Sequence, residues 1–117
     1  MAEGWQPVGE ILVSTMNDLP GYEVVAVHGE VCGLIVRARN LFSNMGAGLR
    51  TVFGGEVRGY TDLLNDSRNQ AIERLREQAR QRGANAVLAM RFDCNEIADI
   101  MSEVAAYGTA VTVRKKA

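Results

Sequence analysis

The stretch YEVVAVHGEVCGLIV, residues 22–36, decides the fold, because it predicts one long strand that is apolar on both faces. Its odd positions include Val25, Val27, Val31 and Ile35. Its even positions carry Tyr22, Val24, Ala26, His28, Glu30, Cys32, Leu34 and Val36. A strand of this kind is usually covered on both sides. Gly29 and Gly33 could each host a bulge, and a bulge at Gly29 would change which side chains share a face.

The segments on either side of this stretch predict a small set of further elements. Residues 11–15 predict a short strand, and residues 17–21 (NDLPG) a turn. A first helix is predicted after Asn40, with apolar residues at helical spacing up to Phe53. A second helix is predicted over residues 60–82, with an apolar stripe and with Gly83 as its C-terminal cap.

Two strands complete the chain. Residues 86–94 alternate between apolar and mixed positions, and residues 104–113 are apolar on both faces. Residues 96–102 are predicted as the connection, although Ile97, Ile100 and Met101 could extend either strand. The predicted fold is therefore α+β in the order β-β-α-α-β-β, a mostly antiparallel sheet packed by two helices. Two helices cover only one face of such a sheet. We expect another copy of the chain to cover the other face or an edge, as in closed homo-oligomers.

Length and composition exclude several classes of protein. The chain has 117 residues, of which 47% are hydrophobic and 23% charged, as in one globular domain. Thirteen basic residues balance fourteen acidic ones, so nucleic acid is not an expected partner. No apolar run approaches the roughly eighteen residues of a membrane span, so no membrane partner is expected.

The two ends of the chain and its cysteines bear on domain limits and compartment. Residues 1–10 form a lead-in without the features of a signal peptide, and residues 11–117 form the single predicted domain. Cys32 and Cys94 lack a CxxC spacing and are expected to be thiols. The expected location is the cytoplasm.

Several short motifs, in order along the chain, are similar to a known family. They are Ser14-Thr15 with LPGYEVV (19–25), VRARN (36–40), GGE (54–56), GYT (59–61), GANAV (83–87) and YGTAV (107–111). Together they resemble the YbjQ-like "putative heavy-metal-binding" family over nearly the whole chain from Ile11. The resemblance implies a dodecin-like α+β subunit that assembles into a pentameric ring. It also implies a bacterial-type cytoplasmic protein without established enzymatic activity, and it brings no ligand motif with it.

The strongest chemical candidate is a metal site at His28, Glu30 and Cys32. On an uninterrupted strand all three share a face, with neighbouring β-carbons about 7 Å apart. Imidazole, carboxylate and thiolate are ligands for a divalent transition metal such as Zn²⁺. The spacing is wide for one ion, so the side chains must converge, or each subunit of a ring must contribute one residue around the axis.

The alternative is structural. His28 and Glu30 would then be hydrogen-bonded at a subunit contact, and Cys32 would be a small buried apolar residue. Cys94 is predicted to lie in the core, and its distance from Cys32 is left open. A nucleophile and its base need to lie 2.6–3.2 Å apart, and His28 and Cys32 are too far apart for this on one strand without a bulge. No enzyme is therefore expected. The second functional hypothesis is an interaction module without a ligand of its own.

Overall fold

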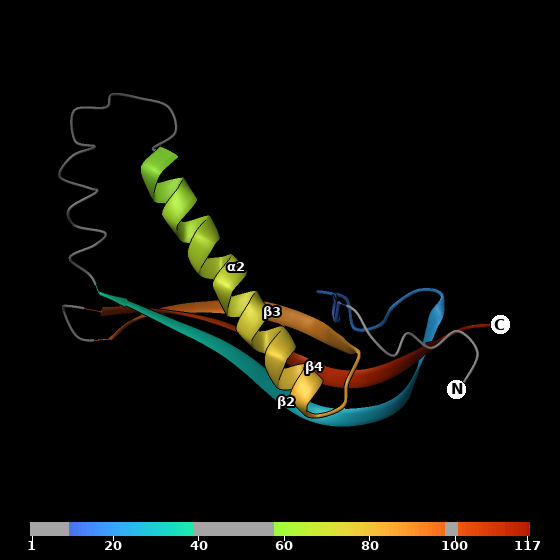
Figure 1. Cartoon of the computed structure of the whole chain (residues 1–117). Helices are drawn as coiled ribbons and strands as arrows, with labels where there is room; N and C mark the ends of the chain where they lie inside the picture. Colours follow the sequence, from blue (N-terminus) through green and yellow to red (C-terminus); the bar gives the residue numbers. More distant parts are fainter. Residues whose placement is uncertain (1–9, 39–57, 98–100) are drawn as a thin grey trace.

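A computed structural model describes residues 10–38, 58–97 and 101–117. Along the chain it contains β1 (Leu12–Val13), β2 (Tyr22–Ala38), α2 (Arg58–Gln81), β3 (Ala86–Ile97) and β4 (Met101–Lys115). The strands form one four-stranded sheet, and α2 lies on one side of it (Figure 1). The α+β class is thus confirmed. The predicted helix between Asn40 and Phe53 lies outside the described residues.

Helix α2 forms where the 3.6-residue period predicted it. Its buried side chains recur every four residues, at Ser67, Ala71, Leu75 and Ala79, and face the sheet. Gly83, with φ of 81°, follows the last turn, and the amide of Ala84 donates to the carbonyl of Ala79 at 3.0 Å. A left-handed glycine with this hydrogen bond is a common helix terminus, and the predicted cap is confirmed.

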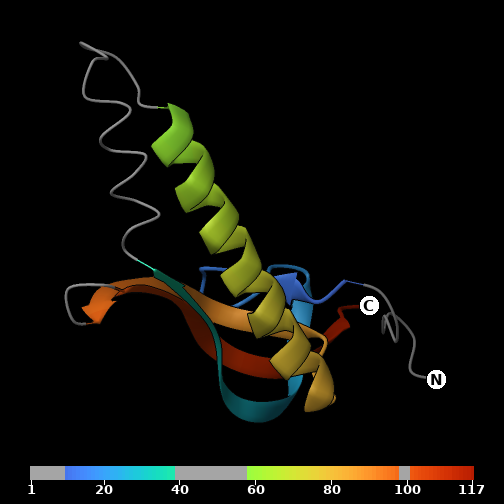
Figure 2. The same cartoon turned by 60° about the vertical axis from the view of Figure 1, so that its left-hand side comes forward.

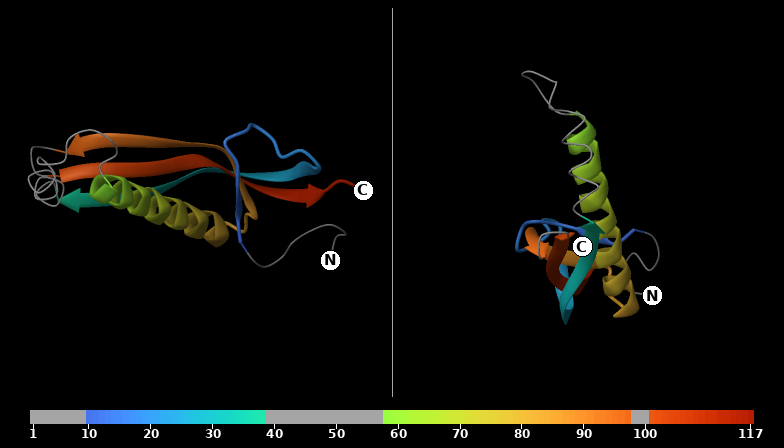
Figure 3. Two further views of the ribbon diagram at one scale, coloured as in Figure 1. Left: turned by 90° about the horizontal axis from the view of Figure 1, so that it is seen from above. Right: turned by 90° about the vertical axis from the view of Figure 1, so that its left-hand side faces the viewer.

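The helix backbone packs directly against the sheet at Gly33. A β-carbon there would overlap the carbonyl oxygen of Ala71 and the amide nitrogen of Leu75, which are backbone atoms of α2. The C-terminal half of α2 therefore rests on β2, whereas its N-terminal half rises away from the sheet (Figures 1 and 2). Seen from above, α2 runs along the β2 side of the sheet (Figure 3).

The sheet is mixed, and its order is β1-β3-β4-β2. The predicted antiparallel pairing of β3 with β4 is confirmed, and β2 pairs with β4 in the same sense. The predicted neighbour relation of the first two strands is wrong, because β1 pairs with β3 in parallel. Strand β3 extends to Ile97 and β4 begins at Met101, so the extension of the strands by these two residues, left open by the sequence, is what the structure shows.

The core explains why β1 leaves β2. Ile11 is buried in the cluster between α2 and the sheet, and its carbonyl accepts a hydrogen bond from Arg76 Nε at 3.1 Å. The chain then follows the edge of β3, where Ser14 N donates to the Val87 carbonyl at 2.9 Å. This anchoring places residues 11–14 beside β3, so the segment up to Gly21 crosses to the far edge instead of forming a hairpin.

Three bulges interrupt the ladders. On β2 the register shifts between Val24 and Ala26 and again between Val27 and Gly29, and Gly29 has a φ of 97°. On β3 the register shifts between Leu88 and Arg91, where Ala89 has a φ of 55°. Each bulge places two residues opposite one, so the alternation of side chains changes face there. Strand β4 carries no extra residue and therefore defines the two faces.

The even positions of β4 face α2, and the odd positions face away from it. Val104, Ala106 and Ala110 belong to the main core cluster with α2. Val111 and Val113 belong to a second cluster on the opposite face, together with Ala86 and Leu88, against which Leu19 and Tyr22 pack. The rest of this helix-free face is not covered by any element that the structure describes.

Candidate functional site

The bulge at His28 separates the three predicted metal ligands. His28 Nε2 lies 2.7 Å from Thr112 Oγ1, and Thr112 Oγ1 in turn donates to the carbonyl of Gly83 at 3.3 Å. Thr112 is an even position of β4, so His28 is on the face that carries α2. The imidazole thus links β2 to β4, and Thr112 links β4 to the glycine that follows the helix.

Glu30 and Cys32 are on the other face. They pair with Thr109 and Tyr107, which are odd positions of β4. The single face predicted for His28, Glu30 and Cys32 assumed an uninterrupted strand, and that assumption is wrong because Gly29 bends the strand. Among residues 10–38, 58–97 and 101–117, no group of three His, Cys, Asp or Glu side chains could hold a metal ion.

Cys32 is half-buried, and its surroundings hold the proton on sulfur. Burial raises the pKa of the Cys32 thiol, and the carboxylates of Glu103 and Glu30 raise it further. Both effects disfavour the thiolate, because a buried negative charge near other negative charges is costly. A cation at this position would act in the opposite direction.

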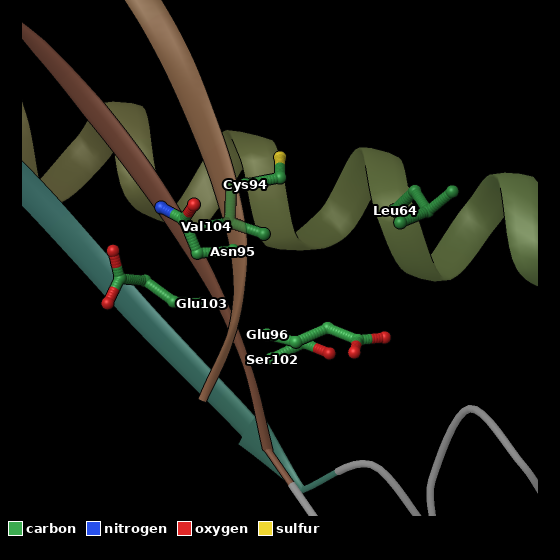
Figure 4. Close-up of a pocket in the computed structure, with 7 residues that line it drawn as sticks. All are labelled: Leu64, Cys94, Asn95, Glu96, Ser102, Glu103 and Val104. Atoms are coloured by element: carbon green, nitrogen blue, oxygen red, sulfur yellow. The ribbon is translucent and has the colours of Figure 1, made fainter. Parts of the chain in front are cut away.

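Cys94 is exposed, so its predicted place in the core is wrong for the described chain. It pairs with Val104 and is on the face of α2, where the helix has already risen from the sheet. A cavity of about 260 Å³ opens there (Figure 4). It is lined by Leu64, Cys94, Asn95, Glu96, Ser102, Glu103 and Val104. The sequence pattern could not reveal this cavity, because it depends on the tilt of the helix.

A row of polar helix residues covers the outer edge of β2. Arg74 Nη1 donates to the Leu34 carbonyl at 2.7 Å, and Arg82 Nη1 donates to the His28 carbonyl at 3.2 Å. Between them, Gln78 Oε1 accepts the amide of Cys32 at 3.1 Å. These bonds occupy backbone groups that an added strand would need. Sequence reasoning missed this role, although the four-residue spacing was visible.

The helix-free face carries exposed apolar side chains. The exposed fractions are 45% for Val24, 68% for Val27, 41% for Leu34, 47% for Val36 and 40% for Tyr107. The four residues of β2 in this set pair with odd-numbered residues of β4, and Tyr107 is itself an odd-numbered residue of β4. They form a strip along β2 and β4, here called the apolar strip, with Glu30 and Cys32 within it.

Comparisons with known proteins agree with the sequence motifs. A UPF0145 protein of Streptomyces coelicolor is 60% identical over 106 residues, which cover 91% of this chain and 100% of that protein. A UPF0145 protein of Sulfurisphaera tokodaii is 48% identical and is covered to 93%. Among described residues, none of the helices has the length and apolarity to span a membrane.

One solved structure shows the same fold at low identity. It is a crystal structure of a protein of unknown function from Pediococcus pentosaceus that belongs to the DUF74 family. The TM-score is 0.57 at 12% sequence identity, over 88% of this chain and 97% of that chain. The family model described as "Putative heavy-metal-binding" matches residues 11–114. The chain therefore belongs to the YbjQ-like family, whose relatives carry the name UPF0145.

Proposed function

We propose that this protein is a non-enzymatic homo-oligomer of the cytoplasm, a pentameric ring by resemblance to its family, which binds a heavy metal or a small ligand. The apolar strip carries the proposal, because a single copy leaves it in water. The free thiols of Cys32 and Cys94, which face opposite sides of the sheet, support a reducing compartment.

The size of the apolar strip supports association. From their exposed fractions, its five side chains expose on the order of 400 Å², within the range of the largest patches on monomers, which are often functional. The strip and a matching surface would bury about 800 Å², close to the roughly 1,000 Å² that a specific interface needs. Partly exposed neighbours within the strip, such as Cys32, would add to this area.

The covered edge of β2 directs the contact to the face. Because Arg74, Gln78 and Arg82 already bind the backbone at residues 28–34, this part of the edge does not accept a further strand. The exposed side chains of the apolar strip lie beside that covered edge. A second copy would then bind through side-chain packing on the helix-free face.

Native mass spectrometry and sedimentation velocity test the proposal with a matched pair of variants. Leu34→Glu places a charge in the apolar strip, and Leu64→Glu places one on α2 at a similar exposure, 41% against 46%. We expect Leu34→Glu to dissociate the assembly and Leu64→Glu to leave it intact. A native protein that is monomeric at micromolar concentration refutes the association. Dissociation by Leu64→Glu alone refutes the choice of face.

A second candidate is an interaction module with no ligand of its own. The observation that favours it is the separation of His28 from Glu30 and Cys32 by the bulge. This candidate predicts the same assembly without bound metal. Elemental analysis of freshly purified protein separates the two, since only the metal-binding candidate predicts metal in proportion to protein.

A further inference from the structure

The chain contains one histidine and two cysteines, and all three lie in the described residues. His28, Cys32 and Cys94 are therefore its complete set of imidazole and thiol ligands. Soft heavy metals are held mainly by such nitrogen and sulfur atoms. The relative positions of these three residues decide which metal sites one copy can build.

The two thiols cannot meet on one ion within a copy. Cys32 faces away from α2, beside Tyr107, whereas Cys94 faces α2, beside Val104. Their strands are separated by β4, which places the backbones about 9.5 Å apart. Two sulfurs on one tetrahedral ion lie only about 4 Å apart. The sheet itself stands between them.

The imidazole is also separated from both thiols, by different distances. His28 binds Thr112 on the face of α2, and Cys94 shares that face beside Val104. Thr112 and Val104 are eight positions apart on β4, a distance of about 26 Å along a strand. Cys32 is nearer to His28 in sequence but is on the opposite face.

We infer that this chain holds a heavy metal through two or more of its imidazole and thiol groups only between copies, so that chelation depends on assembly. The inference rests on the proposed homo-oligomer, because neighbouring copies must supply the second ligand. It goes beyond the family description, because that description would fit a metal site within one subunit equally well. Since the metal would bind the assembly and not the single copy, it would also stabilise the assembly.

Native mass spectrometry of the whole protein, diluted in steps with and without Cd²⁺, tests this inference. We expect Cd²⁺ on species with two or more copies and none on single copies at the same free Cd²⁺. On assembled species, we expect at least one of His28→Ala, Cys32→Ser and Cys94→Ser to abolish retention while the number of copies stays unchanged.

Two results would overturn the inference. One is a single copy that retains Cd²⁺ and loses it on two of the three substitutions, since both ligands would then be in that copy. The other is an assembled protein that retains no Cd²⁺. The spectrum without metal reports separately on the proposed function: single copies alone refute a metal-free ring, while copies joined only by Cd²⁺ support the inference.

Discussion

Gly33→Ala is the most direct test of how α2 is seated on the sheet. The new β-carbon would overlap backbone atoms of Ala71 and Leu75, so no side-chain rotation can relieve the contact. The helix must move outward and loosen the buried residues Ala71, Leu75 and Ala79. Overpacking of this kind costs about 1–3 kcal/mol, and the rigid partner atoms place the expected loss near 3 kcal/mol.

The sign of the effect makes the test decisive. Gly33 is inside a strand without a positive φ, so a substitution free of overlap would stabilise the protein by about 0.5–1 kcal/mol. Gly83→Ala is the matched control, because its φ is 81° and nothing lies within 4 Å of its β-carbon. There we expect only the conformational cost of about 1–2 kcal/mol.

Urea unfolding at a fixed protein concentration measures both variants. We expect Gly33→Ala to lower the midpoint more than Gly83→Ala, with an unchanged denaturant slope. In thermal unfolding, a loss of 3 kcal/mol corresponds to a Tm lower by about 12 °C for a chain of this size. Unchanged or raised stability of Gly33→Ala would refute the close seating. Rescue by Ala71→Gly would show that a side chain, not the helix backbone, makes the contact.

Two further predictions concern β2. Replacing Arg74, Gln78 and Arg82 together by alanine exposes the backbone edge of β2, so we expect faster aggregation, measured by light scattering. Arg80→Ala is the matched control and should leave the aggregation rate unchanged. Glu103→Gln removes a negative charge that raises the pKa of Cys32, so the pKa falls, the thiolate fraction at pH 8 rises, and alkylation of Cys32 accelerates. Peptide-resolved mass spectrometry measures that rate, and an unchanged or slower rate would show that Glu103 does not act on Cys32.

Periodicity predicted the elements whose structure is decided locally. Helix α2 has a stripe of small and apolar residues and a glycine cap, β3 is long enough to show its alternation, and β4 contains a long apolar run. The pairing of β1 with β3 was not visible in this way, because it depends on Ile11 reaching a core built from distant residues. Such a contact leaves no periodic pattern in the sequence.

The candidate metal site depended on an alternation that the strand does not keep. Gly29 was recognised as a position for a bulge, but only the pairing with β4 places His28 and Cys32 on opposite faces. Similarly, the exposure of Cys94 depends on the tilt of α2 and not on the pattern of β3. Tertiary geometry of this kind follows from packing, which a count of apolar positions does not contain.

The row formed by Arg74, Gln78 and Arg82 binds β2 only through main-chain atoms. The identity of the outward side chains at Glu30, Cys32 and Leu34 is therefore irrelevant to this attachment. Substitutions on that face can change its charge and shape while the helix stays fastened in the same place. The architecture thus separates the surface on which new chemistry can evolve from the joint that keeps the domain folded.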